Sequence, residues 1–166
     1  MEGNKSRPRA ILVFGAPCSG KTAFSTKFAK KFGLAYYDFD ELMKHHNFSR
    51  QHILVLLEQI TKTKQTIIIE GALNTEKDRD EIRRILRTAG YEPSLVWLQT
   101  DASTIRSRLK SRYKDVAKAK EVYDTAVSEL EAPSEFERPI ILSGKHTFDT
   151  QSRHVVTGLA DLVEVK

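Results

Sequence analysis

Short apolar runs alternate along the chain with longer segments whose apolar residues recur at helical spacing. Three of the runs, 10–14, 66–69 and 95–98, are continuous rather than alternating, as in strands that are covered on both faces. Residues 35–37 form a weaker fourth run and residues 146–148 a fifth. The pattern therefore predicts a small sheet built from short, buried strands.

Phenylalanines spaced four apart predict the first helix. Phe24, Phe28 and Phe32 fall on one helical face, and Gly33 follows them as a typical helix-ending residue. Further stripes at helical spacing predict three more helices, which lie at about 53–60, 82–89 and 152–164. We therefore expect strands and helices to alternate along the chain.

Capping residues support two of the helix starts. Thr75 and Asp78 form a capping-box pattern, and Asp101 can cap the helix that contains Ile105 and Leu109. Parallel neighbouring strands need crossover connections, so alternating strands and helices indicate a parallel sheet with helices on both faces. We predict an α/β fold, a three-layer α/β/α sandwich with a five-stranded parallel sheet.

Length and composition restrict the class of protein. With 166 residues, 40% of them hydrophobic and 30% charged, the chain suits one globular domain. Because it lacks both an apolar stretch long enough to span a membrane and an N-terminal signal segment, we expect a cytoplasmic protein without a membrane partner. The single cysteine, Cys18, agrees with a reducing compartment.

The net charge of +5 is modest. It suits an anionic substrate, and it is compatible with a nucleic-acid partner without indicating one. Neither charge nor composition predicts an oligomeric state.

A complete phosphate-binding motif follows the first apolar run and precedes the first helix. Its residues are Gly15, Ala16, Pro17, Cys18, Ser19, Gly20, Lys21 and Thr22. In such a loop the glycines let successive N–H groups turn inward, the lysine reaches the β- and γ-phosphates and the hydroxyl binds Mg²⁺. The motif therefore predicts ATP and Mg²⁺ as cofactors.

Together with three further segments, the motif resembles a family of small P-loop kinases. That family includes the kinase domain of phage polynucleotide kinase, zeta toxins, chloramphenicol phosphotransferase and gluconate kinase. The resembling segments are GAPCSGKT, the acidic segment YDFDEL, TIIIEGALNTEKDR and the arginine-spaced IRSRLKSR. The resemblance spans nearly the whole chain and implies phosphoryl transfer from ATP to a hydroxyl group.

The resemblance implies that Asp40 is the general base that takes the proton of the acceptor hydroxyl. Alternatively, Asp40 caps the helix that contains Leu42. Asp38 would face the same way on a strand and could bind Mg²⁺ or substrate, or be a satisfied strand-end carboxylate. Polynucleotide kinase has an arginine shortly after its base, where this chain has Met43 and Lys44, which weakens the case for a nucleic-acid 5′ end as acceptor.

Glu70 ends an apolar run as a Walker B acid does. It could hold Mg²⁺ directly or through water, or play a structural hydrogen-bonding role. The resemblance places Asn74 and Arg79 where relatives contact the acceptor, although solvation on a helix surface explains Arg79 as well.

A basic cluster gives a second group of catalytic candidates. Arg108 and Arg112 lie four residues apart on one helical face, whereas Arg106 points elsewhere. Guanidinium groups stabilise the charge of a transferring phosphoryl group when a lid closes, and the lid here would span about 113–135. The alternative is a solvated helix face.

The sequence thus predicts an ATP-dependent phosphotransferase with a small or nucleotide-like hydroxyl acceptor. Its catalytic residues would be Lys21, Asp40, Arg108 and Arg112. The rival hypothesis is a nucleotide-binding switch or ATPase without an acceptor, in which Glu70 would polarise water; a weaker one is a catalytically idle binding module.

Overall fold

The computed structural model describes residues 7–164, with side chains as far as residue 161. Five parallel strands form one sheet in the order β2-β3-β1-β4-β5. Their bounds are β1 Arg9–Phe14, β2 Ala35–Asp38, β3 Ile67–Glu70, β4 Glu92–Gln99 and β5 Ile140–Ser143. The predicted five-stranded parallel sheet is therefore confirmed.

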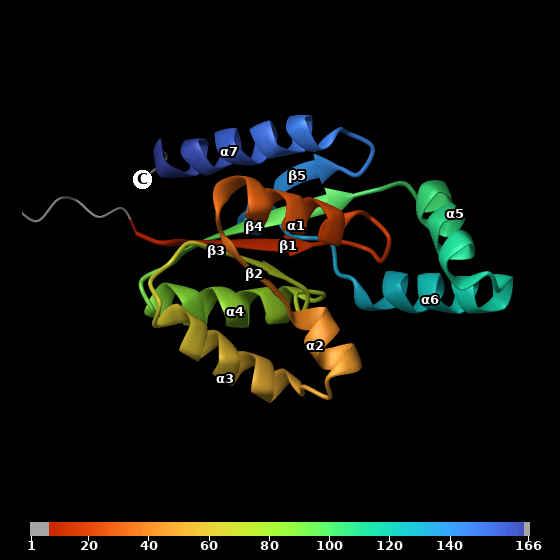
Figure 1. Cartoon of the computed structure of the whole chain (residues 1–166), viewed down its shortest axis with the longest axis horizontal. Helices are drawn as coiled ribbons and strands as arrows, with labels where there is room; N and C mark the ends of the chain where they lie inside the picture. Colours follow the sequence, from red (N-terminus) through yellow and green to blue (C-terminus); the bar gives the residue numbers. More distant parts are fainter. Residues whose placement is uncertain (1–6, 165–166) are drawn as a thin grey trace, which may run out of the picture.

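Helices cover both faces of this sheet, which confirms the three-layer sandwich (Figure 1). On one face lie α1 Lys21–Phe32 and α7 Phe148–Glu164, and on the other α3 Arg50–Thr61 and α4 Glu76–Thr88. Alternate residues of β1 serve the two cores: Leu12 packs towards α3 and α4, and Val13 towards α1. Burial on both sides explains why this strand is continuously apolar.

The predicted helix ends are also confirmed. Gly33 ends α1 in the left-handed conformation with φ 65°, and Thr75 with Asp78 forms the capping box of α4. Asp101 caps α5, which spans Ala102–Tyr113, by accepting a hydrogen bond from the Thr104 N–H. Phe32 differs from its prediction, because its side chain is 43% exposed.

The fifth strand lies earlier than the sequence pattern suggested. Residues 146–148 are not a strand; Phe148 begins α7 and packs against Phe24 of α1. The actual strand, β5, buries Ile140 and Leu142 while Ile141 is 47% exposed. β5 is an edge strand of four residues, IILS, in which burial alternates along a continuous apolar run, whereas the central strands are buried on both faces.

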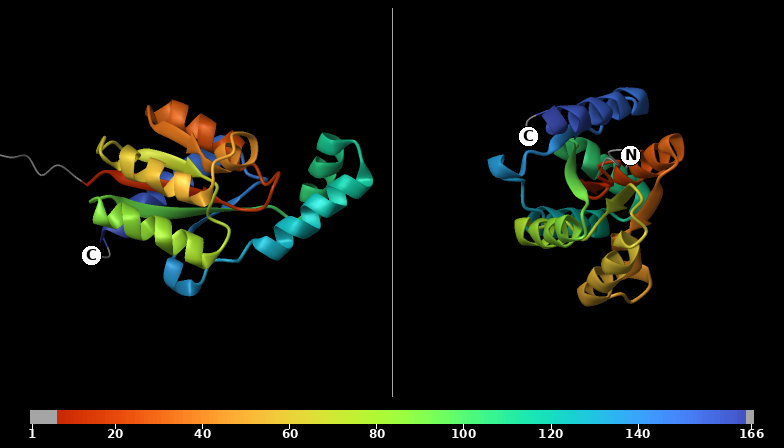
Figure 2. Two further views of the ribbon diagram at one scale, coloured as in Figure 1. Left: turned by 90° about the horizontal axis from the view of Figure 1, so that it is seen from below. Right: turned by 90° about the vertical axis from the view of Figure 1, so that its left-hand side faces the viewer.

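A helical hairpin projects from one end of the sheet (Figures 1 and 2). It consists of α5 and α6, the latter spanning Val116–Glu129, and a short 3₁₀ turn, η1 Glu135–Glu137, follows before β5. The apolar side chains of Ile105, Leu109 and Ala119 form its small core, and Ala16 and Cys18 of the phosphate-binding loop pack against that core. The hairpin thus rests on the loop.

Among residues 7–164, no helix has both the length and the apolar character that spanning a membrane requires.

Candidate active site

The phosphate-binding loop connects the C-terminal end of β1 to the first turn of α1. Gly15 and Gly20 have φ angles of 149° and 106°, which side-chain-bearing residues rarely adopt. A Cβ at Gly15 would also collide with the backbone carbonyl of Leu98. These two positions therefore require glycine, and the loop keeps the tight curl that a phosphate cradle needs.

The remaining loop residues differ in exposure. Ala16, Pro17 and Cys18 are half-buried, while Ser19 is buried and its carbonyl accepts a hydrogen bond of 3.0 Å from the Thr100 hydroxyl. This bond fixes the loop to the end of β4.

The Lys21 ammonium group lies inside the loop. Its Nζ donates hydrogen bonds of 2.9 Å to the Gly15 carbonyl and 3.0 Å to the Ala16 carbonyl. Desolvation lowers the pKa of Lys21, while the negative charges of Glu70 and Asp40 act in the opposite direction. The first turn of α1 carries no acidic residue, so its positive dipole end and the lysine both favour an anion here.

Glu70, at the end of β3, contacts the loop through Thr22. The Thr22 hydroxyl donates a hydrogen bond of 2.7 Å to Glu70 Oε1. The Glu70 carboxylate is only 3% exposed, and this burial raises its pKa although the hydrogen bond from Thr22 opposes the rise. A buried carboxylate beside a hydroxyl provides two oxygens, which is the donor type that Mg²⁺ prefers.

Tyr36 joins this group, although the sequence did not mark it. Its hydroxyl donates 3.0 Å to Glu70 Oε2 and lies 3.2 Å from Asp38 Oδ2. Desolvation and the two carboxylates raise the pKa of Tyr36. Tyr36 lies on β2 and Glu70 on the neighbouring strand β3, so the pairing of these two strands brings the side chains together.

The oxygens of Thr22 and Glu70 fit a magnesium ion, and these two residues would hold it. Among residues 7–164 there is no group of three or more His, Cys, Asp or Glu side chains placed to hold a metal. Mg²⁺ usually binds through one or two carboxylates, waters and substrate phosphates rather than a protein cage. A magnesium ion that binds together with a nucleotide therefore needs only a few oxygen ligands from the protein.

Asp38 and Asp40 have separate structural settings, which corrects the expectation that they face the same way on a strand. β2 ends at Asp38, and the helix α2, Phe39–His45, begins directly after it. Asp38 is the N-cap of α2, because its Oδ1 accepts 2.9 Å from the Glu41 N–H. Asp40 lies inside the first turn, so the alternative reading of Asp40 as the helix cap is wrong.

Asp40 is instead fixed to the loop that follows β3. Its Oδ1 accepts a hydrogen bond of 3.0 Å from the Ala72 N–H. The neighbouring Gly71 has φ 86°, and a Cβ there would come within 2.5 Å of Asp40 Cγ. Gly71 thus permits a close approach that positions the Asp40 carboxylate, a role that the sequence analysis missed.

Arg79 does not face a substrate, contrary to the expectation from the resemblance. It has no exposed surface, and its guanidinium group forms a bidentate pair with Glu137, with distances of 2.7 and 2.9 Å. It also donates to the carbonyls of Leu73, Asn74 and Glu131. This burial leaves Arg79 a structural role.

Asn74 lies in the loop before α4, and its backbone carbonyl contacts Arg79 of that helix. Its side chain is half-buried, and its carbonyl accepts hydrogen bonds from the Glu131 N–H at 2.8 Å and from Arg79 at 3.2 Å. Its backbone therefore joins the loop after β3 to the segment that returns from the hairpin.

Arg108 reaches the phosphate-binding loop from the hairpin. Its Nη1 donates 2.9 Å to the Cys18 carbonyl. Arg112, one turn further along α5, is exposed and its guanidinium lies 5.9 Å from the Tyr113 ring. Arg106 stacks over Tyr123 of α6 at 4.5 Å. Of the three arginines, Arg108 is thus the one that contacts the loop.

This geometry agrees with the comparison of the sequence with known families. A family described as AAA domain matches residues 11–136, which include the phosphate-binding loop, Asp40, Glu70 and the start of the return segment. The chain belongs to this family. Its sequence and fold together confirm the predicted membership of the small P-loop kinase group.

Solved structures of kinases share the fold over nearly the whole chain. A gluconokinase from Sinorhizobium meliloti 1021 is 19% identical with a TM-score of 0.72, covering 96% of each chain. The APS kinase of Mycobacterium tuberculosis in complex with AMPPNP and APS is 21% identical with a TM-score of 0.67, covering 93% of this chain and 98% of that one. A shikimate kinase from Aquifex aeolicus vf5 is 14% identical with a TM-score of 0.55, covering 95% and 98%.

Comparison with curated protein sequences finds no significant match.

Proposed function

We propose that this protein is an ATP-dependent phosphotransferase that moves the γ-phosphate of ATP to a hydroxyl group of a small or nucleotide-like acceptor. The observation that carries the proposal is the position of Asp40. Its charge acts on Lys21 inside the phosphate-binding loop, and a hydrogen bond to the Ala72 N–H orients its carboxylate. Thr22 and Glu70 provide the metal-binding oxygens, so Asp40 is available for a proton.

Each residue then has one task. The N–H groups of the loop and Lys21 bind the phosphates. Thr22 and Glu70 would hold Mg²⁺, which would neutralise phosphate charge. One Asp40 carboxylate oxygen accepts the proton of the acceptor hydroxyl while the hydroxyl oxygen attacks the γ-phosphorus. The bond between the γ-phosphorus and the β–γ bridging oxygen breaks, and ADP leaves with that oxygen.

The hairpin supplies positive charge from the other side of the loop. Phosphoryl transfer spreads negative charge over the equatorial oxygens, which guanidinium groups stabilise. Arg108 already contacts the loop at the Cys18 carbonyl, and Arg112 lies one turn away on the same helix. We assign both to this task, with the predicted lid at about 113–135, which includes α6, excluding water.

The acceptor is the part of the proposal that the fold does not specify. Kinases named for gluconate, APS and shikimate all share this fold with the chain. Acceptor identity therefore depends on side chains around Asp40 rather than on the arrangement of strands and helices.

The experiment is a transfer assay with ATP labelled on the γ-phosphate. Purified protein is incubated with 5′-hydroxyl oligonucleotides, nucleosides, sugars and sugar nucleotides, each in a separate reaction, and the label is followed into products other than free phosphate. We expect one acceptor class to take up label with wild-type protein and not with an Asp40→Asn variant. Label that appears only as free phosphate would favour the ATPase alternative.

A further inference from the structure

The loop that follows β3 holds two consecutive residues in the left-handed region of backbone conformation. Gly71 has φ 86° and Ala72 has φ 57°. Glycine adopts such an angle freely, whereas the Cβ of alanine makes it costly. A residue in a costly conformation persists only where its surroundings hold it, and such residues gather at functional sites. We therefore looked for the contact that holds Ala72.

The conformation of Ala72 bears on the proposed chemistry through its N–H, which donates 3.0 Å to Asp40 Oδ1. Asp40 lies on α2 and Ala72 follows β3, so this bond joins two segments that are 32 residues apart. The direction of the N–H depends on the backbone angles of Gly71 and Ala72, and a hydrogen bond weakens steeply when it is misaligned. A contact that holds Ala72 in place therefore also helps to orient the Asp40 carboxylate.

Arg50, the first residue of α3, makes such a contact. Its Nη1 donates a hydrogen bond of 3.3 Å to the Ala72 carbonyl. Both backbone groups of Ala72 are thus bound, the N–H to the proposed base and the carbonyl to Arg50. Because a donor and an acceptor on opposite sides of one residue are fixed, the left-handed conformation of Ala72 is held from both sides.

Arg50 is itself held by the first turns of α4. Its Nη1 lies 3.0 Å from Asp78 Oδ1, and its Nε and Nη2 donate 3.0 and 2.8 Å to Glu81 Oε2. The side chain of Arg50 is 31% exposed, so these ion pairs are partly shielded from water. Asp78 also accepts 3.3 Å from the Thr75 N–H in the capping box of α4. The guanidinium group therefore connects Ala72 to a well-defined helix start.

We propose that Arg50 is a positioning residue for the phosphoryl transfer. It fixes Ala72, and through the Ala72 N–H it holds the Asp40 carboxylate where that carboxylate takes the proton of the acceptor hydroxyl. This inference rests on the proposed function, because only there is Asp40 the proton acceptor. A misplacement of about 1 Å in an active site can cost about 10²-fold in rate, so a contact that acts through one intervening residue affects turnover.

Hydrogen exchange of the Ala72 amide, followed by ¹H–¹⁵N NMR, tests the contact without ATP or an acceptor. An Asp40→Ala variant removes the hydrogen-bond acceptor and gives the exchange rate of the unbound N–H. We expect Arg50→Gln to raise the exchange rate of the Ala72 amide about fivefold or more, because the bond to Asp40 is weakened. Exchange at the wild-type rate in Arg50→Gln would overturn the proposal.

Transfer kinetics test the consequence for the reaction. Arg50→Gln should lower kcat by about tenfold or more while the affinity for ATP is unchanged, because Arg50 orients the base and does not hold the nucleotide. An equal fall in ATP affinity and kcat would overturn the positioning role. If the wild-type protein transfers phosphate to no acceptor, the proposed function fails, and the exchange rates still decide whether Arg50 holds Ala72.

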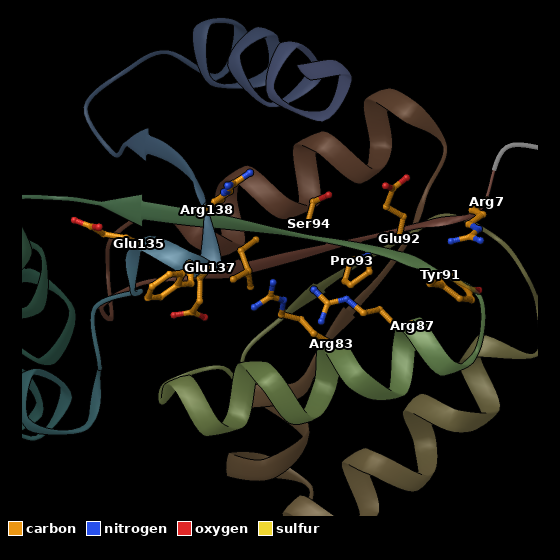
Figure 3. A pocket seen from close by; sticks show the side chains of 12 residues that line it. Arg7, Arg83, Arg87, Tyr91, Glu92, Pro93, Ser94, Glu135, Glu137 and Arg138 are labelled. Carbon is orange, nitrogen blue, oxygen red and sulfur yellow. The ribbon is translucent and has the colours of Figure 1, made fainter. Parts of the chain in front are cut away.

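Arg9→Gln is the matched control for a role in stability alone. Arg9 is half-buried like Arg50, donates 3.0 Å to the Leu159 carbonyl and lies 4.0 Å from Glu92. Glu92 lies at the start of β4 (Figure 3), at the opposite end of the sheet from the loop that follows β3. Arg9→Gln should lose stability in thermal unfolding but keep wild-type Ala72 exchange and kcat. Equal effects in the two variants would overturn the proposal.

Arg50→Lys keeps the test decisive if Arg50→Gln does not fold. Lysine retains the charge beside Asp78 and Glu81 but lacks the planar fork, so it cannot bind these carboxylates and the Ala72 carbonyl together. We expect faster Ala72 exchange and a lower kcat, both to a smaller extent than in Arg50→Gln. Wild-type values of both quantities in the only Arg50 variant that folds would overturn the proposal.

Discussion

At the scale of single residues, the proposed chemistry depends on where the Asp40 carboxylate is held. Asp40 is not a helix cap and not a member of the Thr22–Glu70 pair, and a hydrogen bond from the Ala72 N–H orients it. In the proposed mechanism, these contacts assign proton acceptance to Asp40 and metal binding to Thr22 and Glu70. The two roles can therefore be tested separately, by substituting different residues.

Replacing Asp40 with asparagine should strongly reduce transfer while ATP binding persists. The amide keeps the shape of the side chain but cannot accept the proton, so we expect kcat to fall by about 10²-fold or more. Steady-state kinetics with the acceptor, together with a nucleotide titration, checks this. Glu41→Gln, one exposed position further along α2, is the control and should change neither quantity. Unchanged transfer in the Asp40 variant would remove the assignment.

Gly71→Ala should lower transfer by displacing Asp40. Its Cβ would come within 2.5 Å of the Asp40 carboxyl carbon, so the carboxylate must move. Gly90→Ala is a matched control, because Gly90 has a similar φ of 83° but no atom within 4 Å of the added Cβ. Both variants should lose stability in thermal unfolding through the positive φ, Gly71→Ala more than Gly90→Ala because its Cβ also meets the Asp40 backbone nitrogen at 2.5 Å, and only Gly71→Ala should lose kcat. Equal kcat in the two variants would contradict the positioning role.

At the scale of elements, the buried Arg79–Glu137 pair connects α4 to the segment that returns from the hairpin. Arg79 also binds the Glu131 carbonyl, while the Glu131 side chain accepts 2.7 Å from the Glu76 N–H at the start of α4. The base of the hairpin is thus held against the loop that follows β3. We propose that this base is the fixed point about which the hairpin closes as a lid.

Removing one partner of this pair should be strongly destabilising. Arg79→Met leaves Glu137 buried without its cation, and breaking a buried ion pair costs about 3–5 kcal/mol. Urea unfolding measures the change. Lys120→Met breaks the exposed pair with Asp124 and should cost at most about 1 kcal/mol. Similar losses in both variants would show that the pair does not hold the return segment.

The hairpin arginines should act on turnover rather than on nucleotide affinity. Arg108→Ala and Arg112→Ala should each lower kcat more than they weaken ATP binding, because the charge that they stabilise develops during transfer. Arg106→Ala is the control, since Arg106 stacks on Tyr123 within the hairpin. If ATP affinity falls as much as kcat, the arginines hold the ground state instead.

At the scale of the whole molecule, local patterns predicted most of the fold and part of the site. The phosphate-binding loop was predictable because its glycines, lysine and threonine are contiguous, and β1 and β3 because strands buried on both faces are continuously apolar. The burial of Arg79 was not, because its partner Glu137 lies 58 residues away. Tyr36 and Gly71 were missed for the same reason, since their contacts depend on strand pairing and loop proximity.

The most direct measurement is isothermal calorimetry of the intact protein with ATP and excess Mg²⁺, repeated with a Lys21→Ala variant. The account predicts one ATP bound per chain, and an affinity at least about tenfold lower in the variant, because it loses a charge-assisted contact to the phosphates. Binding of neither adenine nor guanine nucleotides to the wild-type chain would contradict it.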